Sequence, residues 1–113
     1  MKCGPMAAVK KKTQTLIEFE DNELDDVIDI FKALSDHSRV RIISALTRKE
    51  SLCVSDIAEV LDMPISRVSH HLSTLKMLGF VRPKQEGKQV FYSIDDDCIT
   101  DIMKRARDHV AGK

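Results

Sequence analysis

The stretch from Ser51 to Ile94 most narrowly limits what this chain can fold into. Its first part has apolar residues at helical spacing up to Asp62, and Pro64 then suits the first turn of another helix. Gly79 suits the end of that second helix, because glycine readily adopts the left-handed conformation found there. Two segments rich in aromatic, β-branched and basic residues follow. Two short helices, a tight turn and a basic β-hairpin together predict a winged helix-turn-helix.

Apolar spacing predicts two further helices before this stretch. One covers residues 24–34, and the next starts at Ser38, which is a plausible N-cap. The first helix of the helix-turn-helix is expected to begin near Val54 or Ser55, with Ser55 as its cap.

The last third of the chain predicts a hairpin and one more helix. Strands are expected over residues 80–84 and 88–94, and Pro83 confines the first strand to a sheet edge. The aspartates of residues 95–97 are expected to cap a final helix that reaches about Val110. The fold class is therefore mainly α with a small β-hairpin.

The charges are unevenly distributed, although the net charge of the 113 residues is zero. Residues 64–92 carry five basic side chains and only one acidic side chain, Glu86. Residues 16–36 are acidic, with Lys32 as their only basic residue. A basic face and a separate acidic segment allow nucleic-acid binding despite the neutral total.

The helix predicted over residues 64–78 has two different faces. Ile65, Val68, Leu72 and Leu75 form a narrow apolar stripe that is expected to pack on the core. The remaining surface contains no carboxylate and suits contact with base edges and phosphates. Its candidate DNA-binding residues are Ser66, Arg67, Ser69, His70, Ser73 and Thr74. His71 lies beside the stripe, and we expect it to pack or form hydrogen bonds there.

The hairpin adds four candidates for phosphate contact near its tip: Arg82, Lys84, Lys88 and Gln89. A polar helix exposed on an ordinary bundle is the alternative explanation for residues 64–78. The adjoining basic hairpin favours binding to double-stranded DNA.

Several motifs in the same order resemble the ArsR/SmtB family of winged-helix repressors, many of which sense metals. The matching segments begin Phe31-Lys-Ala-Leu-Ser-Asp, Leu52-Cys-Val-Ser-Asp, Val68-Ser-His-His-Leu and Glu86-Gly-Lys-Gln-Val-Phe-Tyr. The resemblance implies a homodimer that occupies operator DNA and leaves it when an inducer binds. Residues 1–21 mix Gly, Pro and a lysine run with few apolar residues, which predicts a mobile arm. Residues 22–113 are predicted to form one DNA-binding and dimerisation domain, dimeric through its terminal helices.

The final helix contains a candidate metal site that requires two chains. Cys98 and His109 are 11 residues apart, which places them on one helix edge but about 16 Å apart along the axis. A single ion with ligand bonds of about 2.0–2.3 Å cannot reach both side chains of one helix. An antiparallel partner helix would bring His109 of one subunit beside Cys98 of the other and so create two identical sites.

Metal-sensing relatives carry Asp-x-His near the start of this helix and His-x-x-Glu or His-x-x-His near its end. The resemblance adds Asp96 to the candidate ligands, while Gly112 stands at the fourth position and offers no side chain. Water, the chain end or Asp108 are possible substitutes for that ligand. A thiolate in the set favours Zn(II), Cd(II) or Pb(II) as the inducer. The simpler alternative is that the aspartates cap the helix and Cys98 is a small interface residue.

A second candidate site involves Cys53 and Cys3. Cadmium- and lead-responsive relatives have Leu-Cys-Val-Cys-Asp at the first position, together with cysteines from the N-terminal arm. This chain has Ser55 in place of the second thiolate, and Cys3 is the only cysteine of its arm. The alternative is a buried Cys53 and a disordered Cys3.

The composition limits the remaining classes of function. No apolar run approaches the length of a membrane span, and no signal-like start is present, so a cytoplasmic protein without membrane contact is expected. No nucleophile–base pair or phosphate-binding glycine loop indicates an enzyme. A thiol-based redox or reactive-sulfur sensor of the same fold, and a protein-binding winged-helix module, are the competing hypotheses.

Overall fold

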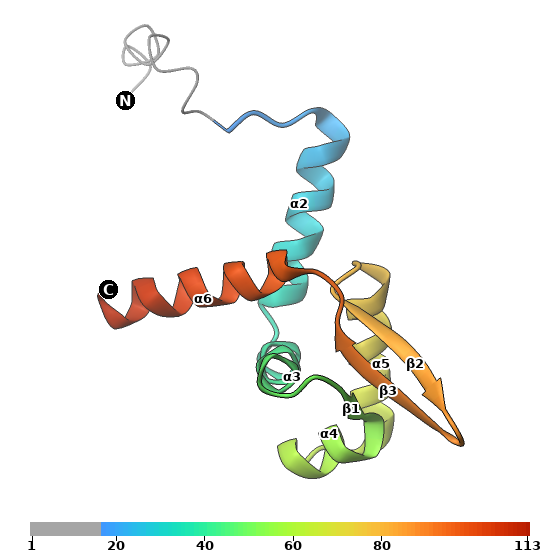
Figure 1. The fold of residues 1–113 in the computed structure, drawn as a ribbon. Coiled ribbons are helices and arrows are strands. Elements are labelled where there is room, and N and C mark those ends of the chain that lie inside the picture. The colour runs from blue at the N-terminus through green and yellow to red at the C-terminus, as the bar shows by residue number, and fades with distance from the viewer. Residues whose placement is uncertain (1–16) are drawn as a thin grey trace, which may run out of the picture.

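The computed structural model describes residues 17–113. Cys3 and most of the predicted arm lie outside the described residues. The helices and strands of the described part, in chain order, are α2 (Asp21–Leu34), α3 (His37–Arg48), β1 (Leu52–Cys53), α4 (Val54–Leu61), α5 (Ile65–Met77), β2 (Val81–Glu86), β3 (Gln89–Ile94) and α6 (Asp97–Ala111). α3, α4 and α5 gather beside the sheet, whereas α2 and α6 extend away from this body (Figure 1).

Asp36, not Ser38, caps α3, so the predicted cap is wrong. The Asp36 carboxylate accepts a hydrogen bond from the Arg39 backbone N–H at 3.1 Å, and the Asp36 backbone is extended. Ser38 already lies within the first turn. An N-cap must stand outside the helix to reach these free N–H groups, and Asp36 has that position.

The turn between α4 and α5 is closed by backbone geometry. Asp62 ends α4 in the left-handed conformation (φ 55°), and the Met63 N–H donates to the Ala58 carbonyl at 2.9 Å. Pro64 is the extended N-cap of α5, one residue before the predicted helical position. Gly79, with φ of 81°, follows the end of α5 as predicted and lets the chain turn into β2.

The wing is an antiparallel sheet with strand order β1-β3-β2. Its hairpin register pairs Val81 with Ile94 and Glu86 with Gln89, which shortens the predicted loop to Gly87 and Lys88. Pro83 does lie on an edge strand, because β2 has β3 as its only neighbour. The two-residue strand β1 was not predicted, since its pairing with β3 depends on residues about 40 positions further along the chain.

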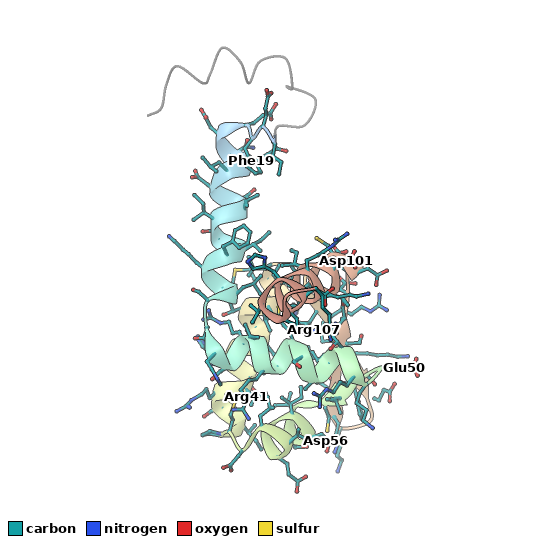
Figure 2. All side chains as sticks on the ribbon, turned by 90° about the vertical axis from the view of Figure 1, so that its left-hand side faces the viewer. Phe19, Arg41, Glu50, Asp56, Asp101 and Arg107 are labelled. Atoms are coloured by element: carbon teal, nitrogen blue, oxygen red, sulfur yellow. The ribbon has the colours of Figure 1, made fainter. Side chains whose placement is uncertain are left out.

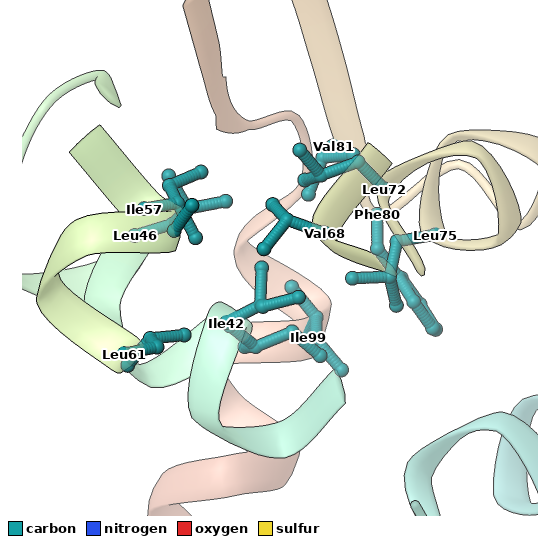
Figure 3. Close-up of a cluster of buried hydrophobic side chains, with 12 residues drawn as sticks. Ile42, Leu46, Ile57, Leu61, Val68, Leu72, Leu75, Phe80, Val81 and Ile99 are labelled. Carbon is teal, nitrogen blue, oxygen red and sulfur yellow. The ribbon is translucent and has the colours of Figure 1, made fainter. Parts of the chain in front are cut away.

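One apolar core joins α3, α4, α5, β2 and α6, and α2, β1 and β3 pack partly buried side chains against it. Figure 3 shows Ile42 and Leu46 of α3 meeting Ile57 of α4, Val68 and Leu72 of α5, and Ile99 of α6. Burying this apolar surface fixes the orientation of α5 relative to the sheet, which is what positions the helix for function. Among residues 17–113, no helix is long and apolar enough to cross a membrane.

Candidate nucleic-acid interface and inducer sites

α5 separates into a buried stripe and an exposed polar face. Val68, Leu72 and Leu75 are completely buried. Ser66, Arg67, Ser69, His70 and Ser73 are exposed, and Thr74 is half-buried. The Thr74 hydroxyl donates to the His70 carbonyl at 3.4 Å. The fold therefore brings all six predicted side chains of this helix to its solvent side, and we call them the α5 face.

Ile65 does not join the stripe, so its predicted place in the core is wrong. It is 56% exposed, although its angular position on the helix is within about 20° of that of Leu72. Ile65 begins α5 and lies two turns from Leu72, at the end of the buried stripe. Angular position alone could not predict this, because exposure at a helix end depends on neighbouring elements.

The wing presents its four predicted side chains to solvent. Arg82 pairs with Asp95 at 3.3 Å, and Lys84 pairs with Glu86 at 3.8 Å. Both partners of each ion pair are exposed. Such exposed pairs contribute little and can exchange one anion for another. Lys88 lies in the turn and Gln89 begins β3, both exposed. The Arg82–Asp95 pair was not predicted, because it depends on the hairpin register, whereas Lys84 and Glu86 lie two residues apart on β2.

His71 is the one buried polar residue of the described chain, which confirms that it packs rather than faces solvent. Its Nδ1 has no hydrogen-bond partner. Burial lowers the pKa of His71, and the neighbouring charge of Asp36 opposes this effect while that of Arg39 adds to it. The backbone hydrogen bond from Arg39 lowers the pKa of the Asp36 carboxyl.

The candidate ligands of α6 lie at its two ends. Asp96 is the N-cap, and its carboxylate accepts from the Cys98 N–H at 2.9 Å. Cys98 and His109 are both exposed. Within residues 17–113 no three His, Cys, Asp or Glu side chains come together in one chain as a metal site. Thiol, imidazole and carboxylate groups fit a thiophilic or borderline ion chemically, but they require a second chain to meet.

The other two residues near the C-terminus offer little to this set. The Asp108 carboxylate is paired with Arg107 at 3.0 Å. Gly112 adopts φ of 80° as the C-cap of α6. The shortage of a fourth side-chain ligand, inferred from the sequence, therefore remains.

Cys53 is buried and is itself the N-cap position of α4. The prediction that Ser55 caps this helix is wrong. Ser55 lies inside the helix, and its hydroxyl oxygen is 3.3 Å from the Cys53 sulfur. The reason is that α4 begins directly after β1, which leaves Cys53 as the last extended residue.

This chain is similar to a known protein family and to individual members of it. The family model described as "Bacterial regulatory protein, arsR family" matches residues 36–82. A cadmium resistance transcriptional regulatory protein CadC homolog of Staphylococcus aureus is 42% identical over 81 residues, which are 72% of this chain and 67% of that protein. The chain belongs to the ArsR family. It is a helix-turn-helix transcriptional regulator and not an enzyme.

Solved structures agree with this fold. The AntR antimony-specific transcriptional repressor is 27% identical and superimposes with a TM-score of 0.76 over 88% of this chain and 89% of its own. A homodimeric winged helix-turn-helix DNA-binding domain from Mycobacterium bovis has a TM-score of 0.73 over 85% of this chain and 91% of its own, at 24% identity. The predicted winged helix-turn-helix of this ArsR-family chain is therefore confirmed.

Proposed function

We propose that this chain is a dimeric, cytoplasmic transcriptional repressor that binds operator DNA and releases it when a thiophilic or borderline metal ion binds. The observation that carries the proposal is the α5 face, which is polar, exposed and free of carboxylates, beside an exposed basic wing. In a helix-turn-helix the second helix enters the major groove, so α5 would contact base edges.

The expected DNA contacts fall into two groups. Ser66, Arg67, Ser69, His70, Ser73 and Thr74 of the α5 face would contact bases or phosphates in the major groove. Arg82, Lys84, Lys88 and Gln89 of the wing would contact phosphates or the adjacent minor groove. Contact with phosphate would replace the weak pairs that Arg82 and Lys84 form with Asp95 and Glu86.

Dimerisation is supported by the apolar surface of the two terminal helices. On α2, Leu24, Ile28 and Phe31 are 44%, 42% and 58% exposed, and on α6 Val110 is 84% exposed. Figure 2 shows the first part of α2 standing clear of the body, whereas Ile30, Ala33 and Leu34 near its C-terminal end are at least partly buried. A two-fold pairing of these helices would bury this surface, and large apolar patches of this kind are typical of interfaces.

The inducer site of the proposal lies between antiparallel α6 helices. Asp96 and Cys98 of one subunit and His109 of the partner subunit would bind the ion, which would link the subunits. If the linked dimer fits DNA less well, binding of the ion lowers the affinity for DNA. Binding of DNA then lowers the affinity for the ion by the same factor. The names of a cadmium regulator and an antimony-specific repressor among similar proteins support a thiophilic inducer. A site that uses Cys53 and Cys3 is the alternative.

A thiol-based redox or reactive-sulfur sensor is a second candidate, favoured by the exposed thiol of Cys98. It would use the same DNA contacts but respond to oxidants or reactive sulfur species rather than to metal ions.

Anaerobic fluorescence anisotropy on DNA from the chain's own promoter tests the proposal. We expect Cd(II) or Zn(II) to weaken binding at least five-fold, the lower end of typical allosteric coupling. Cys98→Ser should abolish this response while leaving metal-free affinity unchanged. Cys53→Ser is the matched control and should respond normally.

The outcomes separate the candidates. A response lost in Cys53→Ser and kept in Cys98→Ser would move the site to α4 and the arm. Affinity that ignores every metal but falls when Cys98 is oxidised would support the redox sensor. Absence of salt-dependent DNA binding would refute the repressor proposal altogether.

A further inference from the structure

Ile65 is one of two large apolar side chains that α5 exposes, the other being Met77 at the opposite end. Ile65 is not held by the core, being 56% exposed. It is also a poor choice for the helix itself, since β-branched residues form helices less readily than Ala, Glu or Lys. Neither packing nor local helix stability accounts for isoleucine at this position.

Two exposed hydroxyl groups lie close to Ile65 on the helix. Ser69 lies one turn further along the same edge, and Ser66 is the next residue in the chain. The first turn of α5 therefore presents a branched apolar group flanked by groups that donate or accept hydrogen bonds. The major-groove edge of thymine has the matching chemistry, a methyl group beside the O4 acceptor. None of the other three standard DNA bases carries that methyl group.

The position of Ile65 also matches the docking geometry of the fold. The N-terminal residues of the second helix of a helix-turn-helix lie closest to the base edges. A β-branched side chain has few rotamers, so it loses little conformational entropy when it is held against a base.

We propose that Ile65 contacts the 5-methyl group of a thymine in each operator half-site and so helps to determine sequence specificity. This inference rests on the proposed operator binding. It adds a residue at the N-terminal end of α5 to the predicted DNA contacts, and it names the base that the residue distinguishes.

The test begins with in vitro selection of duplex DNA by the full chain. Symmetry-related thymines of the selected duplex are then replaced in pairs by deoxyuridine, which lacks only the 5-methyl group. Anisotropy titrations compare wild type with Ile65→Ala, and Met77→Ala is the matched control because it removes a similar exposed apolar side chain at the other end of α5.

At one thymine pair, we expect deoxyuridine to weaken wild-type binding about 15-fold, or about four-fold per half-site, as for the loss of one buried methyl-sized group. Ile65→Ala should bind the thymine and deoxyuridine duplexes equally well, and Met77→Ala should keep the full discrimination at that pair. Two results would overturn this inference alone. In one, Ile65→Ala distinguishes thymine from deoxyuridine as well as the wild type does; in the other, no deoxyuridine replacement changes the affinity of the wild type. If no sequence is enriched, the proposed operator binding is wrong as well.

Discussion

Replacing Lys88 with Ala provides a quantitative test of how the wing binds DNA. Lys88 occupies the two-residue turn of the hairpin and is exposed. The ion pairs found within residues 17–113 involve Arg82 and Lys84 of the wing but not Lys88. Its ammonium group therefore keeps its full charge available for a phosphate, whereas Lys84 has a carboxylate nearby.

The expected magnitude follows from counterion release. Each phosphate neutralised on duplex DNA contributes about −0.9 to the slope of log affinity against log salt concentration. A dimer has two Lys88 side chains, so Lys88→Ala should make the slope shallower by about 1.8. Between 50 and 200 mM salt, the ratio of wild-type to variant affinity should then fall about 12-fold.

Anisotropy titrations at four or more salt concentrations measure both slopes. Lys104→Ala is the matched control, because Lys104 is an exposed lysine on α6, away from the wing. Its slope should equal that of the wild type. Equal slopes of log affinity against log salt concentration for Lys88→Ala and wild type would refute the reasoning, because they would mean that Lys88 contacts no phosphate.

Two further predictions concern stability. Asp36→Ala should lower the free energy of unfolding by about 1 kcal/mol, the usual value of an N-cap, whereas Ser38→Ala should change it little; urea denaturation of both variants distinguishes the observed cap from the one expected from sequence. His71 has its pKa lowered in the folded state by burial, so below the free-histidine pKa of about 6.5 the unfolded chain binds more protons. Stability should therefore be greatest above pH 6.5 and fall on acidification towards the folded-state pKa, and His71→Gln should remove this part of the pH dependence. Urea denaturation between pH 5 and 8 measures it, and an equally steep loss in His71→Gln would assign the effect to other groups. The lowered pKa of Asp36 acts at lower pH, because that carboxylate contributes its stability above the unfolded aspartate value of about 3.9.

Most of the fold could be predicted because its signals are local. The spacing of Val68, Leu72 and Leu75 determined which side of α5 is buried, and Gly79 marked the end of this helix. The aspartates before α6 indicated its start, and Asp96 is indeed the cap. The family motifs, which are also continuous in sequence, were sufficient to identify the winged helix-turn-helix.

The tertiary structure decided the features that depend on residues far apart in the chain. The exposure of Ile65, the strand β1 and the Arg82–Asp95 pair all arise from how separate elements meet. His71 could be placed beside the core from its spacing, but its unpartnered Nδ1 depends on which residues surround it in the fold. By itself, the sequence determined which helices form and which side chains face solvent along α5, because both follow from helical periodicity. Helical periodicity did not predict burial at the helix ends. A side chain there is buried only if another element of the fold covers it, and this depends on tertiary packing.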